Sequence, residues 1–413
     1  MPQRLQAHWK QVSVGAVISL AGITACAVVT RKWFLTAIPI GFLFGFFLEK
    51  ADLCGASAFS EVILMRDWRK IQGLLVLIVV SMLGFALMAR LGIVTLNPKP
   101  LEWATMLVGG AVFGAGMVLA GGCISGALYK SGAGNLNSMA ALVGIPIGIA
   151  LIEYGPLQGF HRFLKHYTIK SATGGPVTLP SLTGLSYGTL AVVFGAITVA
   201  AAAIVSRRKK PIAGKPSPRE EPHAGGLLER IITRPWKPWQ SGILIGLLAC
   251  GGYVSSAASG RNYPLGVTHG VLYTQLLLTD YPLAYVCSPS TSPGPAQQQS
   301  PTGTQAAAKT QPAKKVSVWL ILEVVSLVIG AFFSARLTGR GRLLPKPPDE
   351  TLVAFFGGII TGAGAGIAGY CVVGGIMSGW ALMSVASLIF GVTAIMANWV
   401  MTYLYLMGGT LRG

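Results

Sequence analysis

The chain has 413 residues, of which 11% are charged and 52% are hydrophobic, and its mean hydropathy is +0.62. An ordinary soluble domain carries about 25% charged residues, and a soluble fold with this composition would expose large apolar patches. The composition therefore argues against a soluble enzyme, a disordered protein or a nucleic-acid binder, and it favours a protein embedded in a lipid bilayer.

The apolar runs follow one another along the whole chain and vary in length. A full crossing needs about 20 residues, and the runs 33–48, 138–152 and 268–284 are shorter than that. We therefore predict an all-α, polytopic membrane protein with about nine transmembrane helices, short re-entrant helices and pseudo-symmetric internal repeats. The runs lie at 14–30, 33–48, 71–95, 101–120, 138–152, 184–206, 240–259, 268–284, 316–335, 351–370 and 378–408.

The net charge of +19 comes mainly from connectors between these runs. Such basic connectors are typical of cytoplasm-facing loops close to acidic lipid headgroups. The connectors 207–240 and 336–346 are both basic, so we place both in the cytoplasm. Three apolar runs lie between these two connectors. Because both connectors are on the same side of the membrane, an even number of these runs must cross it, and the short run 268–284 is therefore predicted to be re-entrant. The basic flanks of 33–48 predict the same for that run.

The chain divides into two membrane halves. Residues 1–206 form the N-terminal half with two cysteine elements, 207–239 form a basic cytoplasmic linker, and 240–413 form the C-terminal half with one cysteine element. The insert 287–315 within that half is rich in Pro, Ser, Gln and Ala. It cannot bury a core, and we expect a disordered loop outside the membrane.

Three cysteines mark an internal repeat. Each of Cys54, Cys123 and Cys371 is preceded by two glycines, thirteen and nine residues before the cysteine. Small residues stand three and four positions after each cysteine. A G-x-x-x-G face lets a helix press against a neighbouring backbone. We therefore predict a packed helix, a break, a cysteine and a new helix in each unit. The turn-rich segment 262–270 is a candidate for a fourth unit without a cysteine. The glycine pairs are Gly41 and Gly45, Gly110 and Gly114, and Gly358 and Gly362.

A helix that begins at such a break offers an anion site. Its first N–H groups and the positive end of its dipole point toward the break, and a thiol beside them is a weak donor and a soft contact. The candidate substrate-binding residues are Cys54, Cys123, Cys371, Gly122, Gly126 and Gly374.

The remaining chemistry-bearing residues give weaker signals. Cys26, Cys250 and Cys287 lie in plain apolar runs or at the insert, and we expect no function for them. His161 and His166 lie in a polar connector and are expected to be solvated. Charged residues in membrane segments are functional candidates by default, although those near span ends can reach the interface. These candidates are Arg90, Glu153, Asp280 and Glu323.

The segment GAVFGAGMVLAGGCISGALYKSGAG around Cys123 resembles the signature of the YeeE/YedE family of sulfur-transport membrane proteins. GFLFGFFLEKADLCGASAF around Cys54 and GGIITGAGAGIAGYCVVGGIMSG around Cys371 are similar to that family's other two cysteine elements. The resemblance implies thiosulfate uptake across the bacterial inner membrane through an hourglass-shaped, pseudo-symmetric fold whose path the three cysteines line. It also implies a small soluble sulfur-carrier protein as a cytoplasmic partner.

The chain departs from the family pattern at the insert and at Tyr370, which stands where Gly-Gly-Cys is usual. Some relatives are assigned to selenium metabolism, so a selenium-compound transporter is one alternative. A membrane thiol oxidoreductase is another, but no C-x-x-C pair is present. A metal transporter would need Met, His or carboxylate clusters near the cysteines. We expect no enzyme activity, no cofactor, no metal and no nucleic-acid partner.

Overall fold

The computed structural model describes residues 3–171, 174–208, 234–277, 283–286, 314–341, 343 and 347–408. The described part is a helical bundle with two small strand pairs: β1 (Leu101–Glu102) is antiparallel to β2 (Thr168–Ile169), and β3 (Leu283–Val286) is parallel to β4 (Lys314–Ser317). Eight described helical segments are long and apolar enough to cross a membrane. The prediction of an all-α, polytopic membrane protein is confirmed.

In chain order, the helices of the first half are α1 (Gln3–Val29), η1 (Trp33–Thr36), α2 (Ala37–Ala51), α3 (Gly55–Met65), α4 (Arg69–Arg90), α5 (Trp103–Leu119), α6 (Ile124–Gly132), α7 (Leu136–Glu153), α8 (Gln158–Lys165), α9 (Leu179–Thr183) and α10 (Tyr187–Arg208). Those of the second half are α12 (Pro238–Ala258), α13 (Thr268–Leu276), α14 (Val318–Thr338), α15 (Pro348–Ala368), η2 (Val372–Gly379), α16 (Val385–Met401) and η3 (Thr402–Met407).

Four units repeat one pattern of a long helix, a break, a short helix and a second long helix. They are α2–α3–α4, α5–α6–α7, α12–α13–α14 and α15–η2–α16. Each break contains a residue with positive φ: Asp52 (48°), Gly121 (67°), Gly260 (90°) and Gly369 (64°). Glycine adopts this conformation without strain, and Asp tolerates it better than most residues. The fourth, cysteine-less unit expected around 262–270 is therefore present, with α13 as its short helix.

Glycine pairs hold the units together. In each unit the first long helix packs against the last helix of another unit: α2 on α14, α12 on α4, α5 on α16 and α15 on α7. A Cβ built on the second predicted glycine would lie 1.9–2.3 Å from a backbone carbonyl oxygen of the partner helix, so only glycine fits. The contacts are Gly45 with Leu327, Gly114 with Ala394 and Gly362 with Ile145; in the cysteine-less unit a Cβ on Gly242 would lie 2.4 Å from the Gly73 carbonyl oxygen.

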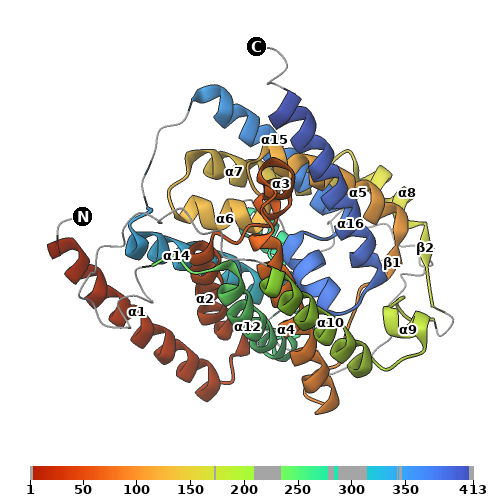
Figure 1. Cartoon of the computed structure of the whole chain (residues 1–413), viewed down its shortest axis with the longest axis horizontal. Coiled ribbons are helices and arrows are strands. Elements are labelled where there is room, and N and C mark those ends of the chain that lie inside the picture. Colours follow the sequence, from red (N-terminus) through yellow and green to blue (C-terminus); the bar gives the residue numbers. More distant parts are fainter. Residues whose placement is uncertain are drawn as a thin grey trace, which may run out of the picture.

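This exchange of helices gives the bundle an internal two-fold pattern. The first and third units exchange long helices, and so do the second and fourth. The halves 1–206 and 240–413 are therefore interlocked, because each unit of one half packs against a unit of the other. Figure 1 shows the two groups side by side, with α2, α4, α12 and α14 in one and α5, α7, α15 and α16 in the other.

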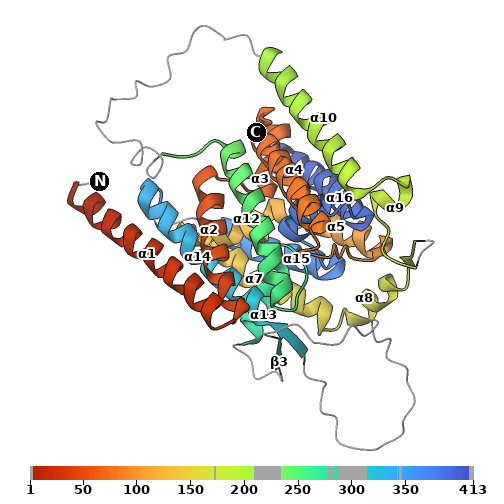
Figure 2. The same ribbon diagram turned by 90° about the horizontal axis from the view of Figure 1, so that it is seen from below.

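The two ends of the bundle differ. Figure 2 places α8, α13 and β3 at one end and the C-terminal end of α10 at the other. At the α10 end the backbone N–H of Trp236 donates to the carbonyl of Lys50 (3.0 Å), which brings the start of α12 beside the end of α2. Arg207 and Arg208 end α10, and Arg336 and Arg340 lie at the end of α14. The positive-inside rule predicts that the end with these residues faces the cytoplasm, and we call it the cytoplasmic end. The α8 end is then the outer one.

The short run 33–48 corrects one prediction. It forms α2, which lies along α14 and belongs to a candidate span covering Trp33–Met65. The short helix that follows the break in this unit is α3. Thr36, before α2, hydrogen-bonds with Ser255 near the end of α12, whereas Lys50, near the end of α2, contacts Trp236 before α12. The two basic flanks therefore lie at opposite ends of the bundle, which their charge alone did not show. Residues 209–233 of the expected linker and 287–313 of the expected insert lie outside the described part.

Candidate functional site

Cys54 and Cys123 lie together at the centre of the bundle. Cys54 is the residue before α3 and Cys123 the residue before α6, and both have extended backbone. Their sulfur atoms are 3.7 Å apart, and both side chains are fully buried. A Cβ on Gly126 would lie 2.4 Å from the Cys54 sulfur, so the missing side chain at Gly126 makes room for that thiol. The Cys123 sulfur also lies 3.4 Å from the Ser125 hydroxyl.

Cys371 joins this centre from the outer side. It precedes the short π-helix η2, and its sulfur accepts a hydrogen bond from the backbone N–H of Gly374 (3.5 Å). Its neighbour Val372 touches Gly55, the residue after Cys54, because a Cβ on Gly55 would lie 2.6 Å from the Val372 side chain. All three thiols belong to one buried core. A Cβ on Gly374 would meet nothing within 4 Å, so this backbone is open toward a cavity.

Tyr370 does not disturb the third break. The residue with positive φ is Gly369, two positions before the cysteine, and Gly121 holds the same place before Cys123. The residue directly before the cysteine needs no glycine. The Tyr370 ring instead lies beneath the Lys99 ammonium, 4.4 Å from nitrogen to ring centroid.

A cavity of about 470 Å³ at the outer end is lined by Gly369 and Gly374, on either side of Cys371 in the chain. Two cations line it. The Lys99 ammonium donates to the Gly369 carbonyl (2.7 Å), and the Arg261 guanidinium donates to the Pro264 carbonyl (2.8 Å). Burial, and next the charge of Arg261, lower the pKa of Lys99 to about 8. Other lining residues are Tyr263, Thr268, His269 and Gly374.

Tyr263 connects this cavity to the third cysteine unit. Its hydroxyl donates to the Gly374 carbonyl (2.8 Å), and its ring lies 5.6 Å from the Arg261 guanidinium and 5.5 Å from the Lys99 ammonium. Lys99 and Arg261 were not predicted from the sequence, and Tyr263 was included only as part of the turn-rich segment 262–270. The signal available was that Lys99 and Arg261 are isolated cations in short, otherwise uncharged connectors on the outer side.

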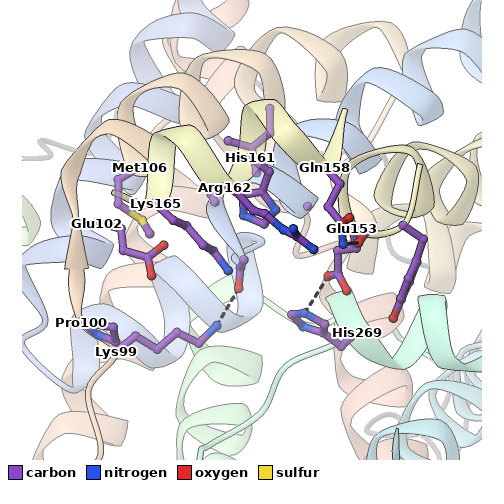
Figure 3. Close-up of a pocket in the computed structure, with 15 residues that line it drawn as sticks. Lys99, Pro100, Glu102, Met106, Glu153, Gln158, His161, Arg162, Lys165 and His269 are labelled. Carbon is purple, nitrogen blue, oxygen red and sulfur yellow. Dashed lines mark hydrogen bonds and ion pairs between the residues drawn. The ribbon is translucent and has the colours of Figure 1, made fainter. Parts of the chain in front are cut away.

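A second outer cavity of about 410 Å³ lies beside the first, with Lys99 and His269 lining both. Figure 3 shows His161, Arg162 and Lys165 of α8 directed toward it from one side, opposite Lys99 and His269. His269 Nε2 lies 3.0 Å from a Glu153 carboxylate oxygen, which connects α13 to α7.

His161 corrects another prediction, since it is 9% exposed rather than solvated. Among the described residues its Nε2 has no hydrogen-bond partner. Burial, and next the charge of Lys165, lower the pKa of this imidazole, which makes it neutral at pH 7. The charged cavity residues that act on this imidazole are Lys165 and Glu153.

The cytoplasmic side of the cysteine pair is built from paired charges. Lys70 donates to the carboxylates of Asp52 (2.8 Å) and Glu61 (2.7 Å), and the Tyr129 hydroxyl donates to the other oxygen of Asp52 (2.8 Å). Lys130 donates to the carbonyl of the break residue Gly121 (2.9 Å). This network joins the first two cysteine units directly below the thiols.

The remaining candidates separate clearly. Arg90 is exposed at the end of α4, and Asp280 lies outside the described residues. Glu323 is fully buried on α14. Cys250 is half-buried, its thiol donating to the Gly246 carbonyl (3.4 Å) within α12, as expected of a structural residue. Among the described residues, no group of three or more His, Cys, Asp and Glu side chains could hold a metal ion.

These features define a polytopic membrane protein with buried thiols between a basic outer cavity and a charged cytoplasmic network, an arrangement suited to a small anion. The sequence model of the family described as sulphur transport matches residues 50–400. The chain therefore belongs to this sulphur-transport family, the YeeE/YedE family.

Two relatives are similar in sequence to nearly the whole chain, and a third is similar to part of it. The thiosulfate transporter TsuA of Spirochaeta thermophila is 28% identical over 379 residues, which covers 89% of this chain and 98% of that protein. The thiosulfate transporter TsuA of Escherichia coli is 26% identical and covers 90% of this chain and 94% of its own length. The probable transporter YedE of Escherichia coli is 31% identical over 120 residues, 29% of each chain.

Proposed function

We propose that this protein takes up thiosulfate, or a closely related sulfur anion, across the inner membrane. The anion enters the cavity beside Lys99 and Arg261, passes Cys371, and then passes the pair Cys54 and Cys123. The observation that carries the proposal is that three thiols, each at the start of a short helix, are buried in one core beside a basic cavity, and that two of them lie 3.7 Å apart. The names of the two relatives that cover nearly the whole chain support thiosulfate as the substrate.

The chemistry of the path fits a soft dianion. Bare transfer of a divalent ion into an apolar interior would cost tens of kcal/mol. Lys99 and Arg261 attract the ion at the entrance, whereas the thiols deeper in the bundle carry no full positive charge. Each thiol or helix N–H contributes roughly 1 kcal/mol net, and such weak, successive sites allow the ion to leave again. The thiols act as protonated donors, so no covalent step is required.

The glycines of the site serve the same path. Gly126 leaves the space that the Cys54 thiol fills, and Gly374 exposes its backbone to the outer cavity beside Cys371. Gly122 is buried directly before Cys123, where a Cβ would lie 3.5 Å from Ala127 N. We assign Gly126 and Gly374 to shaping the path and Gly122 to the close turn before α6.

A small soluble sulfur carrier is the partner we propose on the cytoplasmic side. The network of Lys70, Asp52 and Glu61 joins the Cys54 and Cys123 units on that side of the two thiols. A carrier bound there would receive the anion as it leaves the thiols. The chain itself acts as a transporter and performs no chemistry on the anion.

Uptake into vesicles that hold only this protein tests the proposal. We expect labelled thiosulfate to enter, and unlabelled thiosulfate to compete better than sulfate or selenite. Preferential competition by selenite would instead support a selenium-compound transporter. Failure of thiosulfate to enter at all, with the protein correctly inserted, would overturn the proposal. A disulfide between path cysteines that turns over during uptake would support the oxidoreductase alternative.

A further inference from the structure

Glu323 is a carboxylate within the membrane helix α14, and it has no role in the proposed path of the anion. Its side chain is fully buried, and among the described residues neither carboxylate oxygen has a hydrogen-bond partner. The backbone of the same residue is held tightly, because a Cβ on Gly41 of α2 would lie 2.3 Å from the Glu323 carbonyl oxygen. A buried acidic group in a membrane helix is costly and is by default a candidate functional residue.

Glu323 lies on the face of α14 that meets the outer cavity. Leu320, one turn earlier, lines that cavity, and Trp319, four residues earlier, has its ring 5.4 Å from the Arg261 guanidinium. Residues three and four positions apart are neighbours on a helix surface, so Glu323 lies on the side of α14 that carries Trp319 and Leu320. The charges of Glu323 and Arg261 act on each other, and the Gly266 backbone also acts on the Glu323 carboxylate. Gly266 also contacts Arg261, since a Cβ there would lie 2.7 Å from the guanidinium nitrogen.

The other titratable groups around α14 are engaged elsewhere. On α13, His269 contacts Glu153, and Tyr273 lines the outer cavity. On α2, Glu49 accepts from Ser334 and lies with Lys50 at the far, cytoplasmic end. On α6, Tyr129 and Lys130 are bound to Asp52 and to the Gly121 carbonyl. η1 has no titratable side chain, and Cys26 is the titratable residue in the described side chains of α1, where it is exposed.

We propose that Glu323 is a proton-binding site that couples capture of the anion to protonation. Without substrate, the Glu323 carboxylate balances the charge of Arg261. When thiosulfate binds beside Arg261, the anion takes over that role, and the carboxylate accepts one proton from solution. The buried region then holds neither an unpaired cation nor two competing anions. This inference rests on the proposed function and adds a proton to its binding step.

The test measures protons and thiosulfate together on the purified full-length protein. In weakly buffered solution with an indicator dye, measured from pH 7 to pH 9, we expect thiosulfate binding to the wild type to take up protons, most of all at the alkaline end of the range. Linkage then requires the wild-type affinity to rise as the pH falls. Glu323→Gln keeps the shape but stays neutral. We expect this variant to lose the Glu323 share of the proton uptake, up to one proton per anion, and to bind thiosulfate at least as tightly as the wild type at pH 8.

The controls separate this role from a structural one and from other titrating groups. Glu350→Gln removes an exposed carboxylate of the same type at the cytoplasmic end of α15 and should keep the wild-type proton uptake. The pH series is repeated in a Lys99→Arg background, which removes the titration of Lys99. Weaker thiosulfate binding by Glu323→Gln than by the wild type at pH 8, or unchanged proton uptake by this variant, would overturn the inference. The proposed function would still stand in that case, provided that the wild type binds thiosulfate. Absence of wild-type binding would overturn both.

Discussion

The outer and cytoplasmic ends of the path handle their cations in opposite ways. At the outer end, Lys99 and Arg261 donate to backbone carbonyls beside an open cavity. At the cytoplasmic end, Lys70 is bound by two carboxylates. A carbonyl only partly balances a cation, whereas two carboxylates more than neutralise it. The outer end can therefore attract a dianion, and the cytoplasmic end offers it no deep well, which favours release inward.

The largest effect should come from the thiol between these ends. Cys123→Ala removes a central donor whose sulfur lies 3.7 Å from that of Cys54, and we expect it to abolish growth on thiosulfate as sole sulfur source. Cys250→Ala, in the same bundle but on a helix outside the path, should keep wild-type growth. Full growth of the Cys123 variant at normal expression would contradict the assigned path.

Gly126→Ala sharpens the comparison from the backbone side. The added Cβ would lie 2.4 Å from the Cys54 sulfur, so the thiol has to move. We expect uptake to fall by about tenfold, the equivalent of about 1.4 kcal/mol at the barrier. The matched change Gly22→Ala on α1, where a Cβ meets nothing within 4 Å, should have no effect. Equal uptake by both variants would show that the position of the Cys54 thiol does not matter.

The outer cation gives a pH-dependent effect. Because the pKa of Lys99 is lowered to about 8, its charge is present at pH 7 and is lost as the pH rises through 8. We expect the KM for thiosulfate to rise by roughly tenfold between pH 7 and 9.5, the order expected for loss of one charged hydrogen bond. Lys99→Arg combined with Glu323→Gln removes both titrating groups and should keep a low KM at high pH; a steep rise in that double variant would place the titrating group elsewhere.

The paired cation at the other end should matter less. Lys70→Met removes a charge that Asp52 and Glu61 already balance, so we expect the KM to change by less than threefold, well below the effect of Lys99→Met. Uptake at several thiosulfate concentrations measures both. A larger KM change for the Lys70 variant would reverse the proposed contrast between the two ends.

Mild oxidation tests the geometry of the thiols without a change in charge. Cys54 and Cys123 are close enough to form a disulfide after a small movement, whereas Cys371 contacts the Gly374 N–H instead. Mass spectrometry of oxidised protein should find Cys54 joined to Cys123. A disulfide that includes Cys371 would mean that the outer thiol lies closer than the structure places it.

Much of this molecule could be predicted from local sequence. The low charge content and the apolar runs determined a polytopic helical membrane protein, because the bilayer accepts little else. The spacing of glycines before Cys54, Cys123 and Cys371 determined the repeated unit, because close helix contact and a break both depend on residues a few positions apart. The family resemblance of the cysteine segments followed from the same residues.

Only the tertiary structure decided which parts of distant units meet. The pairing of Cys54 with Cys123, the convergence of Lys99 and Arg261, and the position of Glu323 beside Arg261 all depend on helices from different units packing together. The run 33–48 and the burial of His161 were wrongly predicted for the same reason. Hydropathy and residue spacing predict how a single segment meets lipid or water. The site, in contrast, is formed by side chains that different units bury against one another.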